Sequence, residues 1–320
     1  MACPGRPAVS RPSPPPGNGR SCLGRFRILF VILPGLLAVS WGCDRPATGG
    51  PAAGIVVVDD AGDTLRLAAP ATRIVSLVPA TTELLFALGL GGEVVGRTAW
   101  CDFPAEAAAV PSLGDGLQPN LEAIVATRPG LVVLYNSTLN VAAAARLRAQ
   151  GVPTVLLNTD RLADVPRLAR LLATLGGRPG TGDSLAGAFE RELREVSRPG
   201  SGAPPVVLVL AWDQPPIAIG AGSFLDEIVT RAGARNAFHD LAAASAPVSL
   251  EAIAARDLDY VLVLGDSVPG YAARPEWQSV PAVGARRFLF VPPPLFSRPG
   301  PRSPQAIVAL RSALTAGAGR

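Results

Sequence analysis

The sequence is poor in the residue types on which metal sites and nucleophilic catalysis usually depend. Its 320 residues include one histidine, His239, and four cysteines, and every basic side chain is arginine because lysine is absent. Zinc and manganese sites normally need several histidine, cysteine or carboxylate ligands, so we expect no metal site built by the protein alone. Aromatic residues make up only 5% of the chain, which makes their positions informative.

Positive charge is concentrated at the start of the chain. Five arginines and no acidic residue precede residue 28, and removing them changes the net charge from +4 to about −1. The high pI therefore belongs to this N-terminal segment, and charge does not support binding to nucleic acid. Hydrophobic residues account for 48% of the chain and charged residues for 17%, which excludes a largely disordered protein. The length allows two lobes of about 100–150 residues each.

Residues 1–42 have the pattern of a signal or leader segment. A Pro- and Arg-rich stretch precedes an apolar run of about 15 residues, which is too short for a membrane span of about 20 residues. The small residue before Cys43 resembles a bacterial lipoprotein signal, although Ser40 stands where leucine is usual. We expect export, a lipid on Cys43 and a flexible tether over residues 43–54, with an unanchored secreted protein as the alternative.

Residues 73–104 predict one strand–helix–strand unit. The apolar, β-branched run at residues 74–78 indicates a buried strand, and a second strand follows a glycine-rich stop. Between them we expect Thr81 and Thr82 to cap a helix, with Glu83 in its first turn, where the helix dipole favours a negative charge. Such a unit makes two parallel strands, whose functional loops lie beyond their carboxyl ends.

This unit resembles the start of the first lobe in the vitamin B12-type periplasmic binding proteins, the substrate-binding components of ABC importers for cobalamin, haem and ferric siderophores. The resemblance extends from Ile55 to the C-terminus and is most specific in residues 73–104. It implies an α/β protein with two Rossmann-like lobes, each with a central, mostly parallel sheet, joined by a long rigid helix. It also implies a monomer without enzymatic activity or intrinsic cofactor, which works outside the cytoplasm with a dimeric permease and its ATPase subunits.

The rest of the chain fits this plan. Residues 184–197 predict the longest charged helix. Helix-breaking glycines and prolines flank it at residues 176–182 and after residue 198. The resemblance implies that this helix bridges the lobes. A peripheral helix is the alternative. We expect an N-terminal lobe over residues 55–178, the bridging helix within 179–200 and a C-terminal lobe over 201–320.

Residues 55–67 predict a β-hairpin with an aspartate-rich turn. Asp59, Asp60 and Asp63 lack the glutamate that completes a calcium loop, so we expect a solvated turn and no cation there.

The two predicted lobes contain similar segments. The first lobe has NLEAIVATRPGLVVL and the second has SLEAIAARDLDYVLV. Each has an N-cap residue such as Asn120, a glutamate in the first helical turn, and then a strand. The glutamates are Glu122 and Glu251. They either complement the helix dipole or, as the resemblance implies, dock onto arginines of a dimeric permease, since two equivalent acids suit a two-fold partner.

Aromatic side chains fall in the predicted loops. Trp100, Tyr135 and Trp212 follow strands, and Phe296 lies in the late loop LFSRPGPR. Exposed rings suit a large, flat, partly apolar ligand, although each ring taken singly is equally consistent with loop packing. The resemblance places Trp100 and Tyr135 where cobalamin receptors carry cleft aromatics. Arg298 has either a surface role or contacts a carboxylate or phosphate of the ligand.

We therefore expect the transported ligand to be cobalamin or another corrinoid, with haem or a ferric siderophore as alternatives. The segments before Asn120 and Glu251 lack the tryptophan that cobalamin receptors can show, so the exact ligand stays open.

A secreted hydrolase is the distant alternative. Gly265-Asp266-Ser267 resembles a nucleophile motif, but the only histidine, His239, lies upstream of it. Cys101 is the remaining thiol outside the leader and Cys43, and we expect it to be unpaired.

Overall fold

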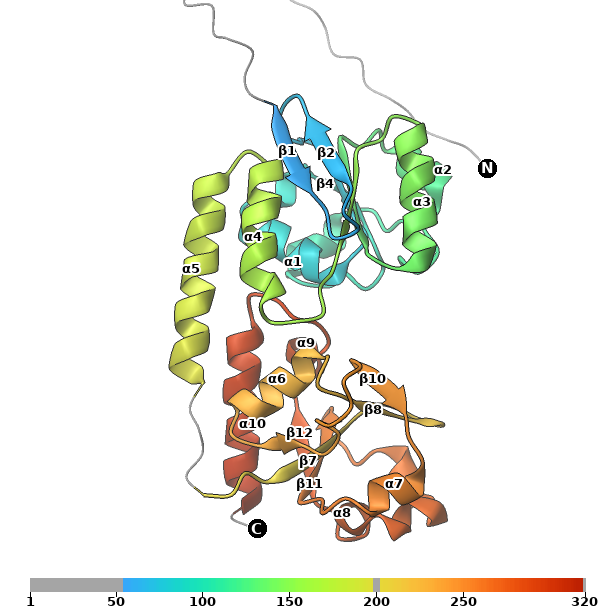
Figure 1. Cartoon of the computed structure of the whole chain (residues 1–320), viewed down its shortest axis with the longest axis vertical. Coiled ribbons are helices and arrows are strands. Elements are labelled where there is room, and N and C mark those ends of the chain that lie inside the picture. The colour runs from blue at the N-terminus through green and yellow to red at the C-terminus, as the bar shows by residue number, and fades with distance from the viewer. Residues whose placement is uncertain (1–53, 198–201, 319–320) are drawn as a thin grey trace, which may run out of the picture. The chain divides into compact units, whose positions relative to one another are not determined.

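The computed structural model describes residues 54–197 and 202–318 (Figure 1). The predicted signal, the proposed lipidation site Cys43 and almost all of the tether lie outside these ranges.

Four parallel strands form the first sheet, in the order β4-β3-β5-β6. The strands are β3 (Ile74–Ser76), β4 (Val94–Arg97), β5 (Leu131–Tyr135) and β6 (Thr154–Leu157). The accompanying helices are α1 (Pro79–Ala87), α2 (Leu121–Ala126), α3 (Thr138–Ala149) and α4 (Asp164–Leu175), with short 3-10 helices at Gly91–Glu93 and Ala105–Ala109. The parallel pairing of β3 with β4 confirms the predicted strand–helix–strand unit.

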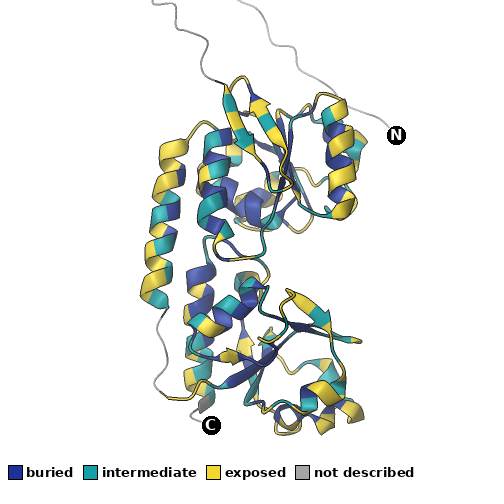
Figure 2. Cartoon of the chain, in the orientation of Figure 1, coloured by how far each residue is buried: buried dark blue, intermediate teal, exposed yellow. Residues whose placement is uncertain are grey.

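Alternate residues of each strand enter two separate cores. Leu131 and Val133 of β5 pack in a core with α1 and α4, whereas Val132 and Leu134 join a core with α2 and α3. Because successive strand residues point to opposite faces, helices on both sides make a three-layer α/β structure. Figure 2 shows the buried strands between these helices.

The helix α1 begins earlier than predicted. Its first residue is Pro79 and its N-cap is Val78, so the expectation that Thr81 or Thr82 caps it is wrong. Proline suits the first helical position because its fixed φ is helical and its missing N–H has no partner there. The hydroxyls of Thr81 and Thr82 instead bond Ser76 Oγ at 2.8 Å. Glu83 consequently lies beyond the first turn and is buried.

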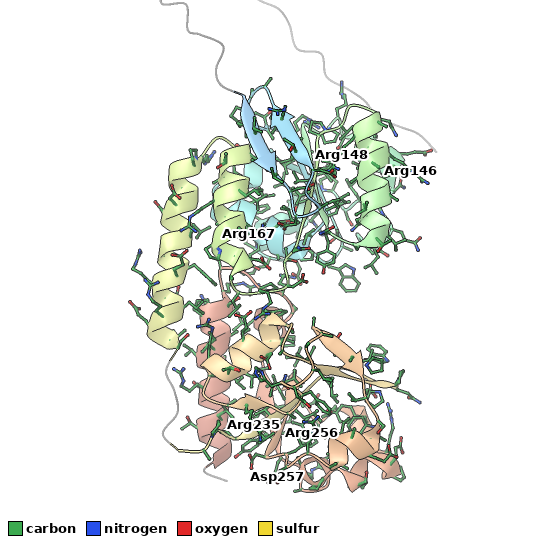
Figure 3. The ribbon with its side chains drawn as sticks, in the orientation of Figure 1. Arg146, Arg148, Arg167, Arg235, Arg256 and Asp257 are labelled. Carbon is green, nitrogen blue, oxygen red and sulfur yellow. The ribbon has the colours of Figure 1, made fainter. Side chains whose placement is uncertain are left out.

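The antiparallel hairpin β1 (Ile55–Val58) and β2 (Thr64–Leu67) is present as expected, but its turn is not simply solvated. Asp59 is buried, and its carboxylate accepts from Arg148 Nη2 at 2.7 Å. Asp60 pairs with Arg167 Nη1 at 2.8 Å. Figure 3 labels both arginines, which hold the turn against α3 and α4.

The second sheet has the order β10-β8-β7-β11-β12, and β9 also pairs with β7. The strands are β7 (Val206–Asp213), β8 (Pro216–Ile219), β9 (Arg235–Asn236), β10 (Ser245–Pro247), β11 (Tyr260–Leu264) and β12 (Phe288–Val291). Its helices are α6 (Phe224–Arg231), α7 (Leu250–Ala254), α8 (Pro281–Gly284), α9 (Pro293–Phe296) and α10 (Ser303–Ala318), with 3-10 helices at Gly270–Ala273 and Pro275–Ser279. β7, β9, β11 and β12 are parallel, and β8 and β10 add an antiparallel edge.

The helix α5 (Pro179–Val196) joins the two halves of the structure (Figure 1). Phe189 packs in the core of the first half, and Leu193 contacts the cores of both halves. The predicted breaker at residues 176–182 is wrong over its second part, because the helix includes Gly182. A Cβ at Gly182 would lie 2.5 Å from the Cβ of Ala173, so this glycine allows α5 to approach α4 closely.

In the two described ranges, no helix combines the length and the apolar character that crossing a membrane requires.

Candidate functional site

A cavity of about 970 Å³ lies at the carboxyl ends of the strands in the first sheet and reaches the second half of the structure. Its wall from the first half includes residues 77–80, Trp100, Asp102, residues 115–118, Tyr135, Leu139 and Asn140; its wall from the second half is Phe224 and residues 297–299. β3, β4 and β5 run parallel, so the loops that follow them meet at one edge. The cavity occupies this edge.

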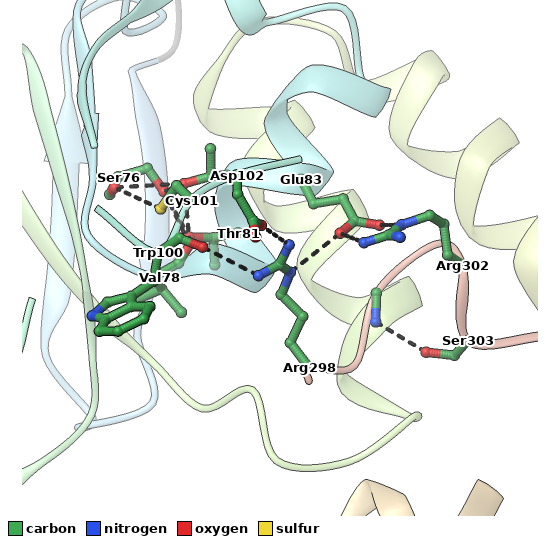
Figure 4. Close-up of polar contacts among 12 residues, drawn as sticks. Ser76, Val78, Thr81, Glu83, Trp100, Cys101, Asp102, Arg298, Arg302 and Ser303 are labelled. Carbon is green, nitrogen blue, oxygen red and sulfur yellow. Dashed lines mark hydrogen bonds and ion pairs between the residues drawn. The ribbon is translucent and has the colours of Figure 1, made fainter. Parts of the chain in front are cut away.

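Trp100 presents its ring to the cavity while its backbone is held in place. The residue is 64% exposed and lines the cavity, and its backbone N–H donates to Thr98 Oγ1 at 3.2 Å. Its carbonyl oxygen accepts from Arg298 Nη1 at 3.2 Å (Figure 4). A ring that is exposed on a fixed backbone can stack on a ligand with little loss of conformational freedom.

Tyr135, the last residue of β5, also lines the cavity. Its hydroxyl donates to Asp160 Oδ1 at 2.9 Å. Burial, together with this hydrogen bond and the negative charges of Asp160 and Asp164, raises the pKa of Tyr135 to about 12. The phenol is therefore neutral at physiological pH, and its one proton is already donated within the protein.

Arg298 and Arg302 enclose the carboxylate of Glu83, and Arg298 also pairs with Asp102 (Figure 4). We call these four residues the Glu83 clamp. Arg302 donates through Nε to Oε1 at 2.7 Å and through Nη2 to Oε2 at 2.9 Å. Arg298 Nε lies 3.4 Å from Oε2, and its Nη2 donates to Asp102. The Glu83 side chain is 3% exposed, so these arginines neutralise a charge that is costly to bury alone.

The clamp connects α1 of the first half to the segment before α10. Burial acts to raise the pKa of Asp102, but the hydrogen bond from Arg298 and the charges of Arg298 and Arg302 outweigh it, so the pKa is lowered. The guanidinium of Arg302 also stacks 3.7 Å from the ring centre of Phe103. Of the clamp residues, Asp102 and Arg298 line the cavity, so the clamp holds this part of its wall in place.

A second set of contacts joins the halves near α6. The backbone N–H of Phe224 donates to the carbonyl oxygen of Asp160 at 2.9 Å. Arg161 Nε donates to Glu227 Oε1 at 2.6 Å, and Leu162 packs in the core of the second half. The cavity walls are thus tied through α5, through the Glu83 clamp and through residues 160–162.

Two of the aromatic residues selected from the sequence lie elsewhere. Trp212 was expected in a loop, but β7 continues through Asp213, and its indole Nε1 donates to the carbonyl oxygen of Gln214 at 2.9 Å. It borders a different cavity of about 260 Å³. Phe296 belongs to α9 and to the core of the second half and is 1% exposed, so its predicted loop position is wrong.

The repeated segments form equivalent helices. Asn120 caps α2 by accepting from Ala123 N–H at 3.0 Å, and Ser249 caps α7 by accepting from Ala252 N–H at 3.1 Å. Glu122 and Glu251 are the second residues of these helices, and both are exposed. Hydrogen bonds from its own backbone N–H and from Ser249 lower the pKa of Glu251, which is therefore a stable negative charge.

Cys101 and His239 each contact a side chain of their own half of the structure. Cys101 is buried, and its sulfur accepts from Thr82 Oγ1 at 3.1 Å. His239 Nδ1 lies 2.9 Å from Asp226 Oδ2, and no hydrogen bond among the described residues joins it to Ser267. Over residues 54–197 and 202–318, no group of three or more His, Cys, Asp or Glu side chains is placed to hold a metal ion.

Sequence reasoning missed Glu83, Asp102, Asp115 and Asn140 as site residues. Glu83 carried a usable signal, because it is the one charged residue of α1 and is followed by two leucines, so a buried position would need a partner for its charge. The other three carried none beyond their position near predicted strand ends.

The cavity between the two α/β halves is large enough to hold a small molecule. Residues 74–295 match the family of periplasmic binding proteins. The vitamin B12-binding protein of Pectobacterium carotovorum subsp. carotovorum (strain PC1) is 29% identical over 247 residues, which cover 76% of this chain and 88% of that protein. The chain belongs to the periplasmic binding protein family, as the resemblance implied.

Two further similarities extend this result. An uncharacterised ABC transporter substrate-binding lipoprotein, YvrC of Bacillus subtilis (strain 168), is 27% identical over 270 residues, covering 81% of this chain and 85% of that protein. The periplasmic haem-binding protein RhuT from Roseiflexus sp. RS-1, solved in its apo form, has a TM-score of 0.68 and 29% identity over 76% of this chain and 99% of that chain. The two-lobed α/β fold expected from the sequence is confirmed.

Proposed function

We propose that this protein is the substrate-binding component of an ABC importer and captures cobalamin or another corrinoid in the cavity beside Trp100 and Tyr135. The observation that carries the proposal is the cavity itself, with two aromatic rings at the carboxyl ends of parallel strands. Its volume of about 970 Å³ is near the upper end of small-molecule sites, which span about 300–1,000 Å³, and suits a large ligand. The relative named as a vitamin B12-binding protein supports this choice.

Haem or a ferric siderophore is the alternative ligand of the same type of receptor. The similarity to a haem-binding protein of Roseiflexus supports haem. We propose binding and delivery without catalysis, which the membership in a family of binding proteins supports.

We further propose that the ligand contacts are Trp100, Tyr135 and the wall around Arg298. Trp212 and Phe296 are not retained, because neither lines this cavity. The proposed division is an N-terminal lobe over residues 55–178, a bridging helix within 179–200 and a C-terminal lobe over 201–320, which the two separate sheets support.

The proposed partners are a dimeric permease and its ATPase subunits. Glu122 and Glu251 are the proposed docking residues, supported by their exposure at equivalent positions of α2 and α7. We propose an exported monomer anchored by a lipid on Cys43, which the similarity to a Bacillus lipoprotein supports.

Titration of a shortened form that starts at Asp44, and so lacks the leader and Cys43, tests the ligand. We expect one cobalamin or cobinamide per protein by calorimetry, with quenching of tryptophan fluorescence. Absence of heat and quenching with both corrinoids, together with clear binding of haem or a ferric siderophore, would transfer the assignment to the alternative. Absence of binding to all of these would contradict the receptor function.

A further inference from the structure

The amino ends of the strands in the first sheet lie on the side of the first half that is opposite the cavity. Because the strands are parallel, the residues that precede them gather on one side of the sheet. Arg73 immediately precedes β3, and Arg128 lies shortly before β5. Arg146 is in the last turn of α3, which returns the chain to this side before β6 (Figure 3). We call this side of the first half the amino edge.

The chain enters the first half beside the amino edge. Ile55, the first residue of β1, pairs in register with Leu67, and the next pair contains Arg66. Soon after β2, the backbone N–H of Ala71 donates to the carbonyl oxygen of Leu175 at 2.9 Å, at the end of α4 that lies nearest this edge. Figure 1 shows the start of β1 at the end of the first half that lies away from the second half.

The amino edge carries exposed arginines that form no ion pair among the described residues. These are Arg66, Arg73, Arg128 and Arg146. The guanidinium of Arg73 donates to backbone carbonyl oxygens, including that of Arg128 at 3.1 Å, so no acid neutralises its charge. Two acids near this edge already have partners, Asp63 with Arg148 and Glu93 with Arg178. Positive charge is therefore in excess at the amino edge.

This excess is not a property of the whole chain. Without the N-terminal segment the net charge is about −1, so acids elsewhere balance the arginines of the amino edge. Exposed acids occur on the opposite side, where Asp115 lies in a loop that lines the cavity and Glu122 lies in the first turn of α2. The first half is thus polarised, and a charged surface would attract its amino edge and repel the side that bears the cavity.

We propose that the amino edge binds anionic phospholipid headgroups and holds the anchored protein with its cavity directed away from the membrane. Guanidinium groups bind phosphate oxygens through paired hydrogen bonds, and each basic residue beside an anionic bilayer strengthens binding about fivefold. A membrane is the polyanion that the chain itself favours, because residues 44–54 span at most about 40 Å between the proposed lipid on Cys43 and this edge. The surface goes beyond the proposed function and does not depend on which ligand fills the cavity.

Sedimentation with lipid vesicles tests the amino edge. The form that starts at Asp44 contains both sheets with their cores and has no acyl chain, so its binding reports on the protein surface. At low ionic strength, we expect it to bind vesicles of equal parts phosphatidylcholine and phosphatidylglycerol, but not vesicles of phosphatidylcholine alone. Arg128→Glu combined with Arg146→Glu should weaken binding at least about tenfold. Arg191→Glu combined with Arg235→Glu is the matched control, since it makes the same charge change at exposed positions of α5 and β9.

Energy transfer to the vesicle measures the orientation of the bound protein. The only cysteine of the shortened form, Cys101, is 1% exposed, so a fluorophore can be attached selectively to a new surface cysteine. Ala149→Cys places it at the end of α3 beside Arg146, and Asp257→Cys places it in the second half (Figure 3). With an acceptor on the lipid headgroups, transfer from position 149 should exceed transfer from position 257.

Four results would overturn the proposal. These are no binding to the anionic vesicles, equal binding to vesicles without anionic lipid, equal losses in the double variant and its control, and transfer from position 257 that equals or exceeds transfer from position 149. None of them bears on the titration with corrinoids, and a failed titration would leave the vesicle results unchanged. The lipid-binding surface and the proposed function can therefore fail separately.

Discussion

The Trp100 ring is the most exposed aromatic surface on the cavity wall, and its contribution can be isolated. We expect Trp100→Ala to weaken corrinoid binding by about 1–3 kcal/mol, because a stacked ring in a binding site contributes an amount of this order. Trp212→Ala is the matched control, since Trp212 is 60% exposed but does not line this cavity. Calorimetric titration of both variants gives the difference. Equal affinities would assign Trp100 to loop packing.

The substitution Glu83→Gln tests whether the Glu83 clamp stabilises the fold. Removing the charge with Glu83→Gln leaves two arginines without their buried counter-ion, and breaking a buried pair in this way usually costs about 3–5 kcal/mol of unfolding free energy. Glu190→Gln is the control, because Glu190 forms an exposed pair with Arg170, and such pairs contribute about 0–1 kcal/mol. Urea unfolding measures both changes. A loss as small in Glu83→Gln as in the control would show that the clamp does not stabilise the fold.

Individual residues show which parts of the site the sequence can predict and which parts it cannot. Trp100 and Tyr135 were found because parallel strands bring their carboxyl ends together, and Tyr135 ends β5 while Trp100 follows β4. Phe296 was misplaced because a phenylalanine after prolines has the same local pattern whether its ring faces solvent or, as here, the core. The partners of Glu83 come from more than 200 residues away, and no local pattern specifies a contact at that separation.

At the scale of elements, α2 and α7 present equivalent acids at their first turns. We expect the double change Glu122→Arg and Glu251→Arg to leave ligand affinity and melting temperature nearly unchanged, because exposed substitutions usually alter stability within about 0.5 kcal/mol. Transport and capture by the permease should fall sharply, since the docking model sets these new positive charges against arginines of the permease. Each single variant should be intermediate. Uptake assays and pull-downs on the three variants measure this.

Two outcomes would contradict the docking model. Normal transport by the double variant would reduce both glutamates to residues that complement the helix dipole. Loss of ligand binding would mean that they act at the cavity instead of at the permease.

Element types were predictable, but their ends were less so. Short apolar runs in the sequence predict the strands β3 and β12 directly. The start of α1 was missed because Thr81 and Thr82 were taken as the N-cap, although Pro79 is also a good first helical residue. The early start of α5 was missed because Gly182 disfavours a helix locally, and only its packing against Ala173 explains its presence.

At the scale of the whole molecule, export and anchoring depend on a part of the chain that the sequence alone describes. Mass spectrometry of the membrane fraction should find a mature N-terminus at Cys43 that carries acyl chains. Cys43→Ser should release the protein or leave its signal uncleaved. A mature form that starts at another residue and stays soluble would contradict the lipid anchor and leave the ligand proposal intact.

The three ties between the halves, through α5, the Glu83 clamp and residues 160–162, have a consequence for the rate of binding. Walls that are already joined leave no slow closing step after the encounter, so the observed association rate should rise in proportion to ligand concentration, without a plateau. Stopped-flow tryptophan fluorescence with increasing cobinamide measures this dependence. A rate that levels off would reveal a closing step that the ties permit. A linear dependence would mean that the lifetime of the complex, set by dissociation, determines how long a captured molecule is available to the importer.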